Sequence, residues 1–269
     1  AEQKAGRFLL SALGTSIDGG LPAGGPDAFN AANTNALEHA GRVLALWEGG
    51  SAYALDPKDL STQGPVTWRS DLQQAPFSAH PKVDAAGNLW NFGTFGRAII
   101  VWHIDAQGRL AKVQVGESPY PGGMAHDMAV TERYLVVPLP PIKFHFEKPV
   151  ADGPRRFALE EGQPLRVLVM EKGDITRRKV FELPPEMVFH VGNAHETADG
   201  RIEMSYIGAA DAWSLDHGAV DLMAARPSRG GMARLQMLTL DMSSGRSTLQ
   251  SFEHGNQEFP RIDPRRIGL

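Results

Sequence analysis

The stretch AIIVWHIDAQGRLAKVQV, residues 98–115, shows the pattern that decides the fold class. An apolar run leads into a tight turn containing Asp105 and Gly108, and a second run follows the turn, which predicts a β-hairpin. Hairpins of this kind that recur every several tens of residues are typical of a β-propeller, while a β-sandwich is the competing all-β architecture. The same outline recurs in SAYALDPKDLSTQG (51–64), RVLVMEKGDITRRKVFEL (166–183) and RLQMLTLDMSSGRSTLQSF (234–252).

A second set of predicted hairpins alternates with the first, and each of them begins with a histidine. They are HPKVDAAGNLWNFG (80–93), HDMAVTERYLVVP (126–138) and HVGNAHETADGRIEMSYIG (190–208). In a propeller the first strand of each blade lines the central axis, so residues at the start of these strands converge there. The topology therefore brings His80, His126 and His190 together. EFPRIDPRRIG (258–268) has a similar outline, with Glu258 in the position of the histidine.

Composition limits the class of protein. The 269 residues, 42% of them hydrophobic, suffice for one large all-β domain over residues 1–269. A net charge of −4 without a Lys/Arg run argues against nucleic acid as the main partner. There is no cysteine, so any metal must be held by His, Asp or Glu. With no apolar stretch of transmembrane length and no signal peptide before Ala1, we expect a soluble, cytoplasmic protein.

Two histidines five residues apart, His190 and His195, raise the question of a shared ion. Gly192 and Asn193 interrupt any helix between them, and in a regular strand the two side chains would point to opposite faces. We expect His190, between Phe189 and Val191, to be buried and His195 to lie nearer the surface or to brace the turn. One buried histidine is more often a hydrogen-bonded core residue than a ligand; three at the start of hairpins favour a metal site. The others are interpreted as ordinary: His39, His103, His145, His195, His217 and His254.

An all-imidazole site suits iron, copper, nickel or zinc. A histidine ligand usually donates its second ring nitrogen to a carboxylate or carbonyl, which fixes the tautomer and the orientation of the ring. Glu48 in LALWEGG ends an apolar strand, where a charge without a partner would be costly, and Glu258 aligns with the histidine positions. Both are candidate partners of the ligands; a salt bridge or a solvated hairpin edge is the alternative for each.

Five stretches together resemble the carotenoid cleavage oxygenase family, which includes apocarotenoid, carotenoid and lignostilbene dioxygenases and a retinoid isomerase. They are ANTNALEHAGRVLALWEGGSAYALDP, FSAHPKVDAAGNLWNFG, MAHDMAVTERYLVV, VFHVGNAHE and EFPRIDPRR, in the family's order. The resemblance implies a seven-bladed β-propeller with Fe(II) on its axis, held by four histidines that three glutamates support. His80, His126 and His190 resemble three of the ligands, and Glu48 and Glu258 two of the glutamates.

The family's fourth histidine and third glutamate lie downstream of the matched region. Nothing after Glu258 can supply either of them, because the sequence ends at Leu269. The resemblance therefore implies that these residues are the central portion of a propeller, with the first and last blades incomplete or missing.

The resemblance also implies a non-haem Fe(II) dioxygenase that uses dioxygen to cleave a C=C bond of a carotenoid or apocarotenoid into two carbonyl products. Trp47, Phe189 and Met124 are candidates for the wall of an apolar substrate tunnel; core packing is their alternative role. Lignostilbene-cleaving members tend to have a lysine before the glutamate, where Trp47 stands, which favours a carotenoid over a stilbene. A metal-free binding scaffold is the alternative of another class. The apolar stretch VVPLPPIKFHF (136–146) is a candidate for peripheral membrane contact.

Overall fold

The structure is a computed structural model of the whole chain that describes residues 26–120, 124–144, 157–218, 221, 224–227 and 230–269. Within these residues, regular structure is almost entirely β-strand, in four four-stranded antiparallel sheets and one two-stranded sheet. The predicted all-β class is confirmed. Among the described residues, no helix has the length and apolar character needed to cross a membrane.

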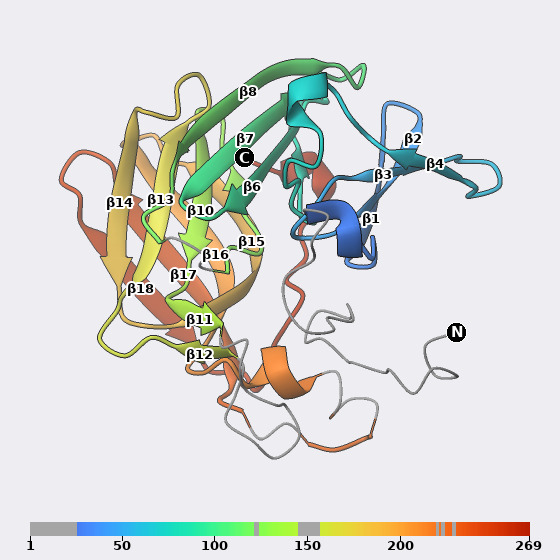
Figure 1. Cartoon of the computed structure of the whole chain (residues 1–269). Helices are drawn as coiled ribbons and strands as arrows, with labels where there is room; N and C mark the ends of the chain where they lie inside the picture. Colours follow the sequence, from blue (N-terminus) through green and yellow to red (C-terminus); the bar gives the residue numbers. More distant parts are fainter. Residues whose placement is uncertain (1–25, 121–123, 145–156, 219–220, 222–223, 228–229) are drawn as a thin grey trace.

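The four large sheets follow one another in chain order (Figure 1). Sheet 1 contains β1 (Asn35–His39), β2 (Arg42–Leu46), β3 (Tyr53–Leu55) and β4 (Thr62–Pro65). Sheet 2 contains β5 (Lys82–Val83), β6 (Leu89–Phe95), β7 (Ala98–Ile104) and β8 (Leu110–Glu117). Sheet 3 contains β9 (Ala129–Val130), β10 (Tyr134–Leu139), β13 (Leu165–Glu171) and β14 (Arg178–Leu183). Sheet 4 contains β15 (Met187–Glu196), β16 (Arg201–Ala209), β17 (Ala233–Asp241) and β18 (Ser247–Phe252).

The remaining elements are short. β11 (Ile142–Phe144) and β12 (Phe157–Leu159) follow β10 and precede β13 in the sequence, and they pair with each other. The helical turns are Pro26–Phe29, Ser70–Leu72, Ser214–Gly218 and Pro264–Arg266. The apolar side chains of Val136, Val137, Leu139 and Ile142 are buried, so they belong to the core, and residues 145–146 of the stretch considered for membrane contact lie outside the described residues.

The predicted hairpins are present, with one exception. The hairpin that decides the fold class is β7–β8, in which Gly108, with φ +77, donates its N–H to the Asp105 carbonyl across the turn. The other outer hairpins are β3–β4, β13–β14 and β17–β18, and the hairpins that begin near histidines are β5–β6, β9–β10 and β15–β16. The expectation for residues 258–268 is wrong: this segment has no strand, and Pro260 and Pro264 lack the N–H that a ladder requires.

Burial of both faces of sheets 2 and 3 gives the propeller packing. In β10 and β13, Val136 and Val167 point towards sheet 4, whereas Leu135 and Leu168 point towards sheet 2. Successive residues of a strand point to opposite faces, so the nearly continuous apolar runs of these strands supply two cores at once. A two-sheet sandwich buries only one face of each sheet. The structure therefore shows blades stacked side by side, as predicted for a propeller.

The third interface, between sheets 1 and 2, is aromatic. Trp102 of β7 and Phe77 pack edge to face with ring centroids 5.6 Å apart, and the Trp102 indole N–H donates to the Pro76 carbonyl at 3.0 Å. A Cβ atom at Gly93 would collide with the same Pro76 carbonyl, so this position of β6 requires glycine. The close approach fixes the segment that leads to His80.

We predict that stability falls as pH rises because of Glu186, which precedes β15. Burial raises the pKa of this carboxyl group, against the hydrogen bonds that Tyr206 and Gln236 donate to it at 3.0 and 2.7 Å. The folded state therefore holds a proton that the unfolded state releases, and unfolding becomes easier as pH rises above the unfolded pKa. Glu186→Gln should flatten this slope at pH values above the unfolded pKa of the glutamate in denaturant titrations; parallel slopes would contradict the prediction.

Candidate metal centre

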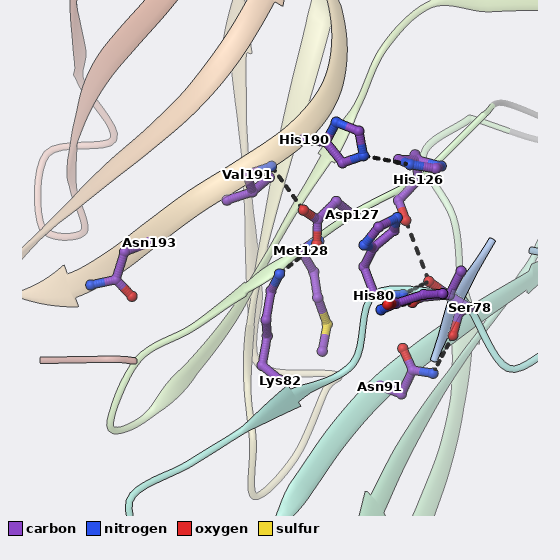
Figure 2. A network of polar contacts seen from close by, with 12 residues as sticks. Ser78, His80, Lys82, Asn91, His126, Asp127, Met128, His190, Val191 and Asn193 are labelled. Atoms are coloured by element: carbon purple, nitrogen blue, oxygen red, sulfur yellow. Dashed lines mark hydrogen bonds and ion pairs between the residues drawn. The ribbon is translucent and has the colours of Figure 1, made fainter. Parts of the chain in front are cut away.

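The three predicted ligands come from three different sheets. His80 lies just before β5, His126 just before β9, and His190 within β15. Each of these strands is the edge strand of its sheet, with a hydrogen-bonded strand on one side only. Because the sheets stack as blades, the three edges meet, and Figure 2 shows the imidazole rings facing one another.

The spacing of the ring nitrogens fits a metal ion. His126 Nε2 lies 3.3 Å from His190 Nε2, and one ring nitrogen from each of the three histidines lies within 4.8 Å of the others. Two imidazole nitrogens that bind one ion at ordinary distances are separated by about 3.0–3.4 Å. His80 Nε2 is buried and has no hydrogen-bond partner among the described residues. An unsatisfied buried nitrogen that faces two others is the arrangement a metal would complete.

Carboxylates lie behind two of the rings. His190 Nδ1 is 2.7 Å from Glu258 Oε2, and His126 Nδ1 is 2.9 Å from Glu48 Oε1. The first contact is an aligned hydrogen bond; the second has the distance of one, but the two groups are not aligned as donor and acceptor. A proton on each Nδ1 leaves the Nε2 lone pairs directed at the common centre. Both predicted glutamates are therefore where a carboxylate supports a metal-bound histidine.

The backbone at Glu258 adapts to this contact. Phe259 has φ +54, an unusual conformation for a bulky side chain, and its N–H donates to Glu258 Oε2 at 2.7 Å. The Phe259 ring lies against the His190 ring, with centroids 4.6 Å apart. The same carboxylate oxygen therefore accepts hydrogen bonds from both His190 and the chain itself, which fixes its position.

Burial sets the charge state of the centre. It lowers the pKa of His80 to about 4 and that of His126 to about 3, so both rings are neutral at pH 7 and can bind a cation. Burial also raises the pKa of Glu48 to about 8, against the attraction of His80 and His190. A dication would supply the positive charge that this carboxylate lacks.

The two histidines of β15 have different surroundings, as predicted. His190 is buried, whereas the side chain of His195 is 38% exposed and lies 3.5 Å from Glu203. The strand is not regular between them, because register shifts interrupt its pairing with β16 on both sides of Val191. These bulges place Val188, Val191 and Ala194 on one face at intervals of three residues. The two side chains are therefore separated as predicted, but by an irregular strand and not by the alternation of a regular one.

The residues predicted to line the substrate tunnel lie in two different parts of the structure. Phe189 stacks on His126 with ring centroids 3.9 Å apart, and with Met124 it packs on the apolar cluster of Met187, Ala209 and Leu215. A cavity of about 150 Å³ borders this cluster and is lined by Met187, Ala209 and Glu258, among others. Trp47 lies next to Glu48 but outside this cluster, and its indole nitrogen is buried without a partner among the described residues.

A group of polar residues beside the ligands was not predicted from the sequence. Asp127 is buried and lies 2.8 Å from the Lys82 ammonium group, and the Asn91 amide donates to the Ser78 carbonyl at 2.7 Å. Burial would raise the pKa of Asp127, but the charges of Lys82 and His80 and its hydrogen bonds outweigh burial and lower it. The available signal was an acidic residue directly after His126 within an apolar run.

The histidines interpreted as ordinary take part in no metal-binding group among the described residues. His39 contacts the Gly87 carbonyl at 3.0 Å, His103 stacks on Trp90, and His217 stacks on Trp213. His145 lies outside the described residues.

Comparison with known proteins gives a consistent result. Residues 1–269 match the family described as retinal pigment epithelial membrane protein. Lignostilbene-alpha,beta-dioxygenase isozyme III of Sphingomonas paucimobilis is 28% identical, over 99% of this chain and 56% of its own length. Apocarotenoid-15,15'-oxygenase of Synechocystis is also 28% identical, over 99% of this chain and 57% of its own length. The chain thus spans about half the length of the curated relatives it matches.

Solved structures show the same relationship. The crystal structure of Pseudomonas brassicacearum lignostilbene dioxygenase superimposes with a TM-score of 0.75 at 25% identity, covering 99% of this chain and 56% of that one. A mutant of Synechocystis apocarotenoid oxygenase gives a TM-score of 0.75 at 23% identity, which shows a shared fold. Since the sequence model of the family matches residues 1–269, the chain belongs to the retinal pigment epithelial membrane protein and carotenoid oxygenase family.

Proposed function

We propose that the full-length protein is a non-haem Fe(II) dioxygenase that cleaves a C=C bond of a carotenoid or apocarotenoid. Its co-substrate is dioxygen, and the products are two carbonyl compounds that each receive one oxygen atom. Residues 1–269 contribute the central portion of a single propeller domain that holds three of the metal ligands.

The observation that carries this proposal is the convergence of His80, His126 and His190. Three imidazoles from three sheets offer nitrogens within 4.8 Å of one another, two of them with a carboxylate behind the ring. A ligand set of neutral imidazoles favours iron, copper, nickel or zinc over magnesium or calcium. The resemblance to carotenoid cleavage oxygenases favours iron among these metals.

The residues of this chain have separate roles in that reaction. Iron held by the three histidines would supply the activation of dioxygen. Glu258 holds the Nδ1 proton of His190, and Glu48 faces Nδ1 of His126 at 2.9 Å. Both carboxylates would orient their rings and, with a dication bound, place negative charge behind neutral ligands. Phe189 stacks against the face of His126 and keeps water from that side of the ring.

An apolar substrate agrees with the surroundings of the site. Phe189 and Met124 lie on one apolar cluster, and the cavity beside it includes Glu258 in its wall, so the substrate wall and the metal centre share a boundary. Relatives named for stilbene and apocarotenoid cleavage are equally similar to this chain. Trp47 favours the polyene, because its indole ring cannot hold a phenolate as an ammonium group does.

Reconstitution of the full-length protein tests the proposal directly. We expect about one Fe(II) per chain and, with a carotenoid or apocarotenoid under labelled dioxygen, two aldehyde or ketone products that both carry the label. A stilbene is the matched alternative substrate. Oxygen uptake separates cleavage from isomerisation or hydrolysis. An iron-loaded protein inert towards all three substrate classes would contradict the proposal, and a protein that retains no metal would favour the binding scaffold.

Replacing a ligand should abolish iron binding while the fold remains. His80→Ala removes one of the three nitrogens, and we expect iron affinity to fall by more than about 100-fold, the upper range for losing a partner behind a ligand. Elemental analysis and circular dichroism report the two effects separately. His195→Ala is the control, because this side chain lies on the same strand as His190 but is partly exposed. Unchanged iron content in His80→Ala would remove His80 from the ligands.

Replacing a carboxylate behind a ring should weaken the metal without removing a ligand. Glu48→Gln keeps the shape of the side chain but loses its charge, and we expect iron affinity to fall about 10-fold to 100-fold. Metal competition titration measures this change. The matched control is Glu203→Gln, which alters the carboxylate beside the non-ligand His195. Equal affinities of the Glu48 variant and the wild type would show that this carboxylate does not support the ligand.

A further inference from the structure

One buried carboxylate contacts all three segments that carry the predicted ligands. The side chain of Asp127 is 3% exposed. Its Oδ1 lies 2.8 Å from Lys82 Nζ and accepts the N–H of Met128 at 2.7 Å, while its Oδ2 accepts the N–H of Val191 at 2.8 Å. Figure 2 shows Lys82 and Val191 approaching this carboxylate from opposite sides.

Each contact lies one or two residues from a histidine. Lys82 begins β5, two residues after His80; Asp127 directly follows His126; and Val191 directly follows His190. The carboxylate therefore links sheets 2, 3 and 4 next to the point where their inner edges present the rings.

The contact with β15 compensates for an irregular strand. Val191 lies between two register shifts of the β15–β16 pairing, and β15 has no neighbouring strand on its other side. Asp127 accepts the Val191 N–H on that open side, where no ladder holds the backbone. The Glu196 carboxylate also bonds β15 to sheet 3, but six residues from His190, whereas the Asp127 contact lies directly beside this histidine.

We propose that the Lys82–Asp127 ion pair is a positioning device that sets the mutual distances of the His80, His126 and His190 rings. The inference rests on the proposed metal function of these rings. Metal–ligand distances tolerate deviations of only about 0.2 Å, so ligands from three separate sheets require directional contacts between their strands. A carboxylate with three donors at fixed angles supplies such contacts, whereas apolar packing does not.

A purely electrostatic role for the pair predicts a different outcome. If only charge mattered, loss of the Asp127 carboxylate would weaken the binding of a dication, and loss of the Lys82 ammonium group would strengthen it. If the pair positions the strands, both losses weaken binding, because either one releases the same contact. The sign of the Lys82 effect therefore separates the two roles.

The experiment compares three single variants and one double variant of the full-length protein by titration with Co(II) alone. Asp127→Asn and Lys82→Met each remove one half of the pair. Glu196→Gln is the matched control. Glu196 also joins β15 to the β9–β10 hairpin, because it accepts hydrogen bonds from Thr131 and Arg133. It lies six residues after His190, away from the rings. We expect Co(II) affinity to fall about 10-fold to 100-fold in both pair variants and to stay unchanged in the control.

The double variant should lose no more affinity than Asp127→Asn alone, since both changes break one interaction. Tighter Co(II) binding by Lys82→Met would overturn the proposal in favour of a charge effect. An equal loss in Glu196→Gln would overturn it in favour of general destabilisation. If Asp127→Asn does not fold, Lys82→Met decides alone, because the Lys82 side chain is 17% exposed, against 3% for Asp127.

A second readout does not depend on the metal. Histidine ring signals in the nuclear magnetic resonance spectrum of the metal-free protein should shift in both pair variants and not in the control. If the wild type binds neither Co(II) nor Fe(II), the proposed function fails. The ring signals still test whether the Lys82–Asp127 pair positions the histidines. Ring signals identical in all variants would overturn it.

Discussion

Packing of sheets 2 and 3 between two neighbours brings the edge strands that carry the histidines to a common centre, and the metal centre depends on that convergence. Val136 and Leu135 are adjacent in β10, yet they belong to different cores on opposite faces of sheet 3. Such strands cannot lie at the surface of a two-layer protein. Once sheets stack in this way, edge strands far apart in sequence approach one another, and their first residues share one small volume.

Desolvation then decides the chemistry of that volume. The same burial that keeps His80 and His126 neutral also disfavours an ionised Glu48. Neutral imidazoles and buried carboxylates are costly together, unless a cation restores the balance of charge. The ligands and the groups behind them therefore form one electrostatic unit, in which a buried carboxylate beside neutral rings favours binding of a dication.

Much of this arrangement was accessible from the sequence. Repeated apolar runs separated by Asp/Gly turns predicted the hairpins, and the position of three histidines at their starts predicted the meeting of their side chains. Glu258 was proposed from its alignment with the histidines, and its carboxylate does contact His190, but its segment has no strand and Phe259 has a left-handed backbone instead. That conformation leaves no periodic signal in the sequence.

The bulges of β15 could not be predicted from the sequence either. Two extra residues in the strand leave the alternation of inward and outward side chains in register at its two ends and change it only in the middle. Val188, Val191 and Ala194 share a face only because of them. The role of Asp127 was missed for a related reason. A single acidic residue after a histidine does not reveal that a lysine from another sheet and a backbone N–H from a third will reach it.

A contribution to the stability of the fold does not readily explain the buried Lys82–Asp127 pair. Ion pairs removed from water are often no more stabilising than apolar side chains of similar volume, because desolvation offsets their attraction. The cores on both sides of sheet 3 show that these sheets already associate through apolar contact. What apolar contact lacks is direction: it tolerates sliding of one strand past another, whereas the Asp127 carboxylate meets its donors only in one register. A site assembled from three sheets needs that register more than it needs additional stability.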